Sequence, residues 1–266
     1  MSCTLVTAFY NFPAKKYHTN NYLVWMKAFL ENTNNNMIIY TDSQESADII
    51  SKFRENFKDI TKIIIEPFQN LYCAKFQNYW DKDLYRDHER SYHNQMLYII
   101  WNEKTMFMYK TYKMNPFNTE YYAWIDIGMV RNQNYIKFLH NFPSKKRIEQ
   151  LDKSKVYLVV INKFTENELN SVVPSETFRY VDRLGAGMIM CHIDIIEKWK
   201  TEYYNMLELF MNNNLFSGKD QSIINSLYIK HKNKFIELVD TDDLTQIDNK
   251  WFYMLYFLSD YYISNN

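Results

Sequence analysis

Apolar residues alternate between short runs and helical periods along the first 66 residues of the chain. The runs are rich in β-branched and aromatic residues, as buried strands are, and they cover residues 4–10, 37–40 and 60–66. Between the runs, apolar positions recur every three or four residues around 22–30 and 49–57, which predicts two helices. This β-α-β-α-β order predicts a parallel sheet with right-handed crossovers.

The rest of the chain continues this alternation less regularly. One long helical period covers 91–114 and stops before Asn115-Pro116, and the segment 121–127 follows as the clearest central strand. Further strands are predicted at 156–161, 188–191 and 235–239, and further helices at 193–211, at 218–230 and from 249 onward. No repeat, Gly/Ser linker or change in composition divides the sequence, so we expect a single α/β domain.

Charge, apolar length and cysteine spacing exclude several classes of protein. Lys plus Arg equals Asp plus Glu at 31 each in 266 residues, so no overall field attracts nucleic acid or an anionic membrane. The most apolar stretch, 251–258, is far shorter than the about 20 residues of a spanning helix, and the N-terminus lacks a signal-peptide pattern. Cys3, Cys73 and Cys191 are too far apart for a disulfide framework or a C-x-x-C site. We expect a cytoplasmic protein with reduced thiols and no membrane span.

Asp126 lies at the end of the predicted central strand, in Y-Y-A-W-I-D-I-G-M-V-R at 121–131. A carboxylate in this position can accept from a ribose hydroxyl or ligate a cation, and Gly128 would let a ligand approach the backbone. Arg131 could then bind a phosphate through two N–H groups. The alternative is an ordinary turn in which Arg131 pairs with a surface acid.

Ligands of parallel sheets bind at the carboxyl ends of the strands. This rule places four more candidates near a ligand crevice. They are Thr7, Ala8 and Phe9 on the first strand and Asp42 just after the second.

The second half of the chain adds two glycines and a second acidic position. Gly185 and Gly187 enter a predicted strand in L-G-A-G-M-I-M-C-H, which indicates tight backbone packing or a ligand wall. Asp220 and Gln221 open the segment D-Q-S-I-I-N-S-L. Asp220 is either the N-cap of a helix or a functional carboxylate, and its position after Gly218-Lys219 favours the cap.

Several common catalytic motifs do not occur. The six histidines form no H-x-x-x-H or H-E-x-x-H pair, which argues against a zinc hydrolase. No G-x-x-x-x-G-K-[ST] or G-x-S-x-G segment exists, so a P-loop phosphotransferase and an α/β-hydrolase are also excluded.

Six segments, taken in order, carry a family resemblance: T-L-V-T-A-F-Y at 4–10, I-I-Y-T-D at 38–42, N-E-K-T-M-F-M-Y at 102–109, N-P-F-N-T-E-Y-Y-A-W-I-D-I-G at 115–128, G-A-G-M at 185–188 and D-Q-S-I-I at 220–224. Together they resemble the HtrL/YibB (WlaTC-type) family over nearly the whole chain, and W-I-D-x-G after N-P-F is the most specific of them. That family is similar to glycosyltransferases of the GT-A type.

The resemblance implies a GT-A-like Rossmann-type mixed sheet with flanking helices. Residues 1–128 would form the nucleotide-binding half and 129–266 the acceptor-side half. GT-A enzymes bind a nucleotide-sugar, here expected to be UDP-linked, and usually a Mn²⁺ or Mg²⁺ ion through a D-x-D motif. Gly128 stands where that motif has its second Asp, so Asp126 is the only candidate metal ligand and metal dependence should be weak.

The resemblance also suggests roles for individual residues. Lys104 and Arg131 would neutralise the leaving diphosphate, Gly187 would belong to the donor site, and Asp220 and Gln221 would act at the sugar-transfer step. The expected function is sugar transfer from a nucleotide-sugar to a carbohydrate or other hydroxyl acceptor, by inversion or retention. The alternative is a noncatalytic carbohydrate-binding or assembly protein with aromatic residues that stack on sugars. A nucleotidyltransferase acting on nucleic acid is third, and the neutral net charge argues against it.

Overall fold

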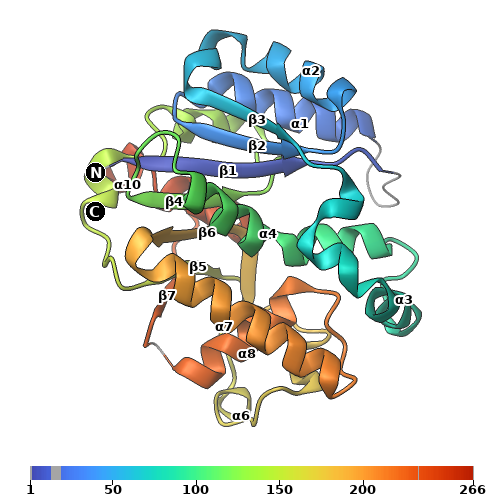
Figure 1. The fold of residues 1–266 in the computed structure, drawn as a ribbon. Coiled ribbons are helices and arrows are strands. Elements are labelled where there is room, and N and C mark those ends of the chain that lie inside the picture. Colours follow the sequence, from blue (N-terminus) through green and yellow to red (C-terminus); the bar gives the residue numbers. More distant parts are fainter. Residues whose placement is uncertain (1, 13–18, 233, 266) are drawn as a thin grey trace.

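A seven-stranded mixed sheet forms the centre of the molecule, with the strand order β3-β2-β1-β4-β6-β5-β7 (Figure 1). The computed structural model describes residues 2–12, 19–232 and 234–265. The strands are β1 (Cys3–Phe9), β2 (Met37–Thr41), β3 (Thr61–Ile65), β4 (Tyr121–Ile125), β5 (Val156–Val160), β6 (Leu184–His192) and β7 (Ile236–Val239). The sequence-based expectation of one α/β domain with a Rossmann-like mixed sheet is confirmed.

Strands β1 to β4 are parallel, as the β-α-β-α-β pattern predicts. β1 pairs with β2 on one side and with β4 on the other, and β3 pairs with β2. Every residue of β1, β2 and β4 is buried, which explains why these strands are continuously apolar rather than alternating.

β6 runs against this direction and makes the sheet mixed. It is antiparallel to both β4 and β5, and β5 is parallel to β7. Ile125 at the end of β4 lies opposite Met188, so the first residues of β6 extend beyond the carboxyl end of β4. The backbone N–H of Asp126 continues this pairing and donates to the carbonyl of Gly187 at 2.8 Å. Antiparallel β6 therefore brings its two glycines to the edge where β1 and β4 end.

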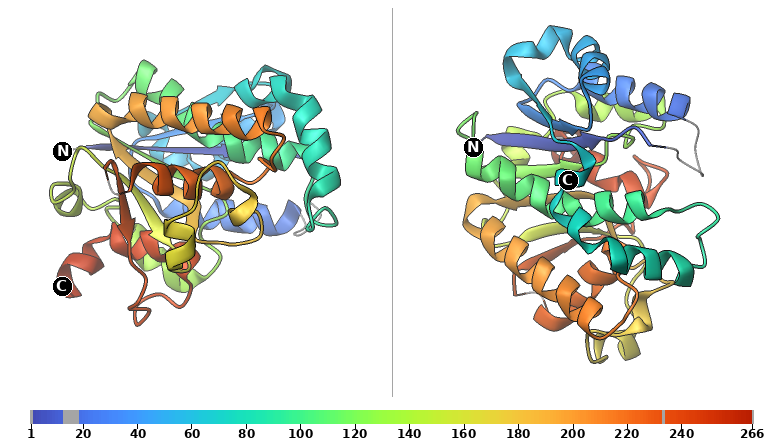
Figure 2. Two further views of the ribbon diagram at one scale, coloured as in Figure 1. Left: turned by 90° about the horizontal axis from the view of Figure 1, so that it is seen from below. Right: turned by 45° about the vertical axis from the view of Figure 1, so that its right-hand side comes forward.

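Helices cover both faces of the sheet (Figures 1 and 2). The α-helices are α1 (Thr19–Asn32), α2 (Gln44–Phe53), α3 (Gln77–Arg86), α4 (Gln95–Met114), α5 (Lys145–Ile148), α6 (Glu166–Leu169), α7 (Ile193–Asn212), α8 (Asp220–His231), α9 (Tyr253–Phe257) and α10 (Asp260–Asn265). Short 3₁₀ segments are η1 (Glu55–Ile60), η2 (Phe68–Asn70), η3 (Tyr72–Phe76), η4 (Gln133–Leu139), η5 (Glu176–Phe178) and η6 (Lys250–Phe252). Among these described helices, none combines the length and the apolar character needed to cross a membrane.

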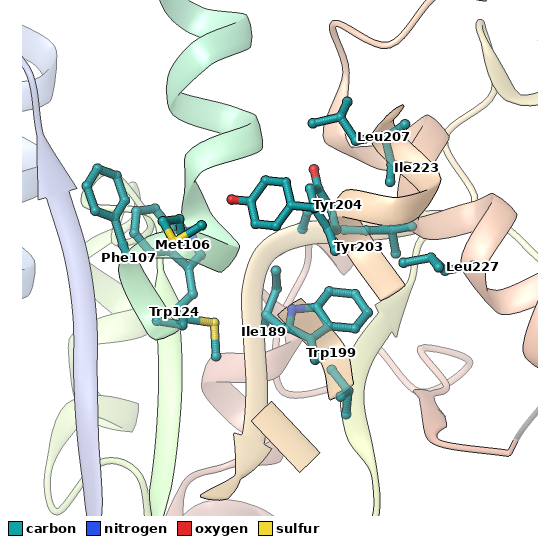
Figure 3. Close-up of a cluster of buried hydrophobic side chains, with 14 of the residues drawn as sticks. Met106, Phe107, Trp124, Ile189, Trp199, Tyr203, Tyr204, Leu207, Ile223 and Leu227 are labelled. Atoms are coloured by element: carbon teal, nitrogen blue, oxygen red, sulfur yellow. The ribbon is translucent and has the colours of Figure 1, made fainter. Parts of the chain in front are cut away.

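Two hydrophobic clusters, one on each face of the sheet, hold these layers together. Helices α4, α7 and α8 supply one cluster, and α1, η4 and α9 supply much of the other. In the first, Trp199 and Tyr203 of α7 pack near Ile223 of α8 and close to β6 (Figure 3). Trp199 is fully buried, so Trp199→Ala should cost about 3–5 kcal/mol.

Several element boundaries differ from the sequence prediction. The strand expected at 188–191 begins earlier, at Leu184, because β5 pairs with Leu184 and Gly185. The helix expected at 91–114 begins at Gln95, since the Asn94 side chain accepts from the amide of Leu97 and caps it. At the other end, Asn115 adopts a left-handed conformation with φ 33° and stops α4 just before the proline. The helices expected at 49–57 and from 249 are each broken into α and 3₁₀ pieces.

Candidate functional site

A cleft of about 840 Å³ opens where β1 and β4 end. Its lining comes from the end of β1, the middle of α4, the loop after β4, the start of β6 and the start of α8. The lining includes most of the candidate residues identified from the sequence, namely Ala8, Phe9, Lys104, Asp126, Gly128, Arg131, Gly187, Asp220 and Gln221. Residues separated by more than two hundred positions thus converge on one cavity.

The two remaining candidates, Thr7 and Asp42, do not line this cleft. Thr7 of β1 is completely buried. Side chains alternate along a strand, so Thr7 lies on the face of the sheet opposite to Ala8, which lines the cleft. Asp42 accepts hydrogen bonds from the hydroxyls of Thr41 and Ser43 at the start of α2. Neither residue is therefore brought into contact with the other candidates in this cleft.

Lys104 is the hub of the site. Its Nζ lies 3.1 Å from Oδ1 of Asp126 and 2.9 Å from Oδ2 of Asp220, and it donates to the carbonyl of Ala186 at 3.0 Å. The ammonium thus donates one hydrogen bond and forms two ion pairs, and among the described residues Oδ2 of Asp220 accepts no hydrogen bond. The side chain is only 5% exposed, and an ammonium buried this deeply requires such partners to offset its lost hydration.

The charges of the cluster shift the pKa of Lys104 and of Asp220. Burial lowers the pKa of Lys104, but the two carboxylates outweigh burial and leave it raised, so the ammonium stays charged. Burial raises the pKa of Asp220, and repulsion by Asp126 adds to it, while Lys104 opposes the shift only in part. One ammonium thus serves two carboxylates, and it offsets the burial of Asp220 only in part.

Asp126 differs from Asp220 in its access to the cleft. Its side chain is 43% exposed, whereas that of Asp220 is 8% exposed. The indole N–H of Trp124 donates to Oδ1 of Asp126 at 2.8 Å and fixes the carboxylate directly after β4. Asp126 is therefore an oriented carboxylate that a ligand can reach.

Gly187 forms the wall beside this carboxylate. A Cβ atom at this position would lie 2.9 Å from Cε of Met129 and 3.5 Å from Oδ2 of Asp126. The absence of a side chain therefore keeps the backbone of β6 close to the Asp126 carboxylate. A ligand in the cleft can approach the same backbone.

Asp220 does not act as the N-cap of α8. Lys219 occupies the cap position, makes no side-chain capping bond, and the helix begins at Asp220 itself. The carboxylate is instead paired with Lys104, so the cap interpretation of the sequence is wrong. Gln221 lies in the same turn and donates to the carbonyl of Leu184 at 3.4 Å, which leaves it at the cleft wall beside β6.

Arg131 supplies positive charge at the rim of the cleft. Its Nε donates to the carbonyl of Gly128 at 3.1 Å, and its guanidinium lies 4.6 Å from the ring centroid of Trp25. These contacts orient the guanidinium while the residue remains exposed. Gly128 is buried, and a Cβ there would lie 3.3 Å from the Trp25 ring, so this glycine serves packing beneath the arginine.

The residues around Asp126 do not fit a standard divalent-cation site. Gly128 offers no ligand atom, and the Lys104 ammonium lies between the two carboxylates where a bridging cation would otherwise balance them. Positive charge at this position comes from the chain itself.

Sequence reasoning missed two further walls of the cleft. One carries Glu89, His93, Trp101 and Lys219, and the other carries aromatic and amide groups, including Tyr22, Asn249, Trp251 and Phe252. The first wall had a signal, the dense polar run D-H-E-R-S-Y-H between α3 and α4. The second had none, because its aromatic residues look like core positions in the sequence.

No curated protein matches the sequence at a significant level. A family model described as "Bacterial protein of unknown function (HtrL_YibB)" matches residues 1–258. This is nearly the full length, and it agrees with the resemblance carried by the six sequence segments. The chain therefore belongs to the HtrL_YibB family.

Proposed function

We propose that this protein transfers a sugar from a nucleotide-sugar, UDP-linked by the family resemblance, to a hydroxyl group of a carbohydrate or related acceptor. The observation that carries the proposal is the Asp126–Lys104–Asp220 cluster at the carboxyl edge of the sheet. Nucleotides bind at this edge in open α/β sheets. A cleft of about 840 Å³ is large enough for a ligand of this size.

The exposed carboxylate of Asp126 would accept hydrogen bonds from the ribose or from the donor sugar. Arg131, held over Trp25 at the rim, would bind the diphosphate and stabilise the charge that develops as it leaves. The aromatic wall with Tyr22, Trp251 and Phe252 would receive the base by stacking.

We propose that Lys104 positions both carboxylates and does not bind the diphosphate, which is the role expected from sequence. Its ammonium is already surrounded by Asp126, Asp220 and the carbonyl of Ala186. Asp220 would lie under the donor sugar with Gln221 beside it, where the two can orient hydroxyl groups.

The proposal includes transfer without a required metal ion. Arg131 at the rim would supply the positive charge that a D-x-D enzyme obtains from its cation. We also propose that the protein acts in the cytoplasm, which is compatible with three buried free cysteines.

One observation favours a second candidate, a carbohydrate-binding protein without catalysis. Aromatic side chains line both ends of the cleft, and such surfaces bind sugars in the absence of chemistry. Both candidates predict sugar binding, but only the transferase predicts cleavage of the donor.

A thermal-shift screen of nucleotide-sugars, with Mn²⁺ and with EDTA, tests the proposal. UDP release from each stabilising compound is then followed by chromatography. We expect a UDP-sugar to stabilise the protein in both conditions and to be hydrolysed slowly without an acceptor. Stabilisation by free saccharides alone, with no UDP release, would support the binding protein instead.

A further inference from the structure

The polar wall beside α4 contains an Asp–His pair that the proposed donor site does not use. Nδ1 of His93 lies 2.7 Å from Oδ2 of Asp87, and the hydroxyl of Tyr98 donates to the same oxygen. Both Asp87 and His93 are buried, at 3% and 7% exposure. The backbone N–H of Glu89 donates to the other oxygen of Asp87 at 2.8 Å, so the carboxylate is held from both sides.

These contacts keep Asp87 ionised and fix the tautomer of the imidazole. Burial alone raises the pKa of Asp87, but hydrogen bonds from His93, Tyr98 and the Glu89 amide outweigh burial and lower it to about 2. An ionised carboxylate only accepts hydrogen bonds, so the proton of a neutral His93 ring resides on Nδ1. The lone pair then resides on Nε2.

Nε2 is available from the cleft. His93 belongs to the cleft lining, and among the residues that the structure describes Nε2 neither makes a hydrogen bond nor is sealed from solvent. Trp101 packs against the imidazole with ring centroids 4.9 Å apart and an interplanar angle of 87°. The ring is thus held by Asp87 on one side and by an aromatic neighbour on another, with one nitrogen open.

Asp220 is less suited to take a proton from an incoming hydroxyl. Its carboxylate is already paired with the Lys104 ammonium, so an acceptor would have to displace that ion pair. Glu89 is also engaged, because it pairs with the ammonium of Lys219. Asp87, Glu89 and His93 lie close enough together to suggest a cation site. Because the Lys219 ammonium already balances the charge of Glu89, we interpret Asp87 and His93 as a hydrogen-bonded pair instead.

We propose that His93 is the general base of the transfer reaction and that Asp87 positions it. The inference rests on the proposed transferase function. The acceptor hydroxyl would lie against Nε2, with its sugar ring on the aromatic surface of Trp101 and Tyr92, which line the same wall. A saccharide acceptor fits this aromatic surface.

The step balances with the groups named. The hydroxyl oxygen of the acceptor forms a bond to the anomeric carbon of the donor, and its proton moves to Nε2 of His93. The bond from the anomeric carbon to the diphosphate oxygen breaks, and the electron pair leaves with UDP. This direct displacement by the acceptor would proceed with inversion at the anomeric carbon.

The test compares His93→Gln, Asp87→Asn and the exposed control His140→Gln. UDP binding is measured by calorimetry, turnover by UDP release from the most stabilising UDP-sugar with water as the acceptor, and the His93 tautomer by long-range ¹H–¹⁵N NMR. We expect wild-type His93 to carry its proton on Nδ1 and UDP affinity to change less than twofold in all variants. Turnover should fall by about 10²–10⁴-fold in His93→Gln and Asp87→Asn and stay normal in His140→Gln.

Each other outcome has a defined meaning. Normal turnover in His93→Gln with intact UDP binding would overturn the role of His93 and leave the transferase proposal standing. A proton on Nε2 in the wild type would also overturn it, and that readout requires no turnover. A wild type that neither binds UDP nor releases it from any UDP-sugar would overturn the transferase proposal itself, and the base with it. Should His93→Gln fail to fold, Asp87→Asn and the tautomer decide.

Discussion

The ammonium of Lys104 lies 2.9 Å from Oδ2 of Asp220, although 116 positions separate the two residues in the sequence. Both side chains are almost completely buried. The first residue of α8 is thereby tied to the middle of α4, and the second carboxylate of the cluster, Asp126, pairs with the same lysine. The folded core and the proposed site share this ion pair, so its removal should affect stability and function together.

Replacement of Lys104 by Met should destabilise the protein by about 3–5 kcal/mol, because it leaves the buried carboxylate of Asp220 without its partner. The double variant Lys104→Met/Asp220→Asn should recover part of this loss, since the carboxylate that then lacks a partner, Asp126, is 43% exposed and remains hydrated. Urea denaturation measures the free energy of unfolding of the wild type, the single variant and the double variant. Lys113→Met removes an exposed ion pair with Glu197 and serves as a control that should change little. Equal destabilisation of the single and double variants would contradict the pairing.

Asp87 should make stability depend on pH in the acid range. Its pKa falls from 3.8 to about 2 on folding, so between these values the unfolded chain binds more protons and stability decreases as the pH falls. The stability difference between wild type and Asp87→Asn should be full above pH about 4 and disappear towards pH about 2. Denaturation curves at several pH values measure this, with exposed Asp59→Asn as the control. A difference that does not vary with pH would show that Asp87 is not held as a carboxylate.

The two glycines of β6 should respond differently to alanine. A Cβ at Gly185 would lie 2.7 Å from Cγ1 of Val159, a stiff β-branched side chain, so Gly185→Ala should cost about 1–3 kcal/mol. At Gly187 the close atom is the flexible end of Met129, which can move, so the stability loss should be smaller. Gly187→Ala should instead weaken binding of UDP-sugars beside Asp126. A larger stability loss at Gly187 than at Gly185 would count against this distinction.

Arg131→Ala should weaken UDP binding by about 10–100-fold, the range for a lost charge-assisted hydrogen bond, while the melting temperature remains nearly unchanged. The exposed Lys145→Ala is a control for net charge. Calorimetric titration with UDP and with uridine separates the diphosphate from the base. An equal effect on both ligands would place Arg131 elsewhere than at the diphosphate.

The parallel half of the fold was predictable from sequence, but the completed site was only partly so. Strands β1, β2 and β4 are buried on both faces, so each is a continuous apolar run in the sequence. Asp126 is conspicuous because it is a charged residue directly after the run of β4. Lys104 could not be assigned its role from sequence, because a lysine inside a helix usually reaches solvent. Its burial depends on where β6 and α8 place Ala186 and Asp220.

Other errors have equally local causes. Asp220 resembles an N-cap in sequence, yet the helix begins one residue earlier than a cap requires, and a distant lysine takes the carboxylate. The role of His93 could not be predicted, because no sequence motif connects it to Asp87. The two residues are six positions apart in the turns between α3 and α4. Such pairings depend on the path of a loop, which hydrophobic periodicity does not describe.

The most direct test of the account is UDP release from UDP-sugars by wild type and Asp126→Asn, each assayed with Mn²⁺ and with EDTA. Asn keeps the shape of the side chain but removes the negative charge, which pairs with Lys104 and which we propose binds the ligand. We expect the wild type to release UDP both with Mn²⁺ and with EDTA. In a folded Asp126→Asn variant the affinity for the nucleotide should be weakened by about 1–3 kcal/mol. Unchanged affinity in that variant, or wild-type activity that EDTA abolishes and Mn²⁺ restores, would contradict the account.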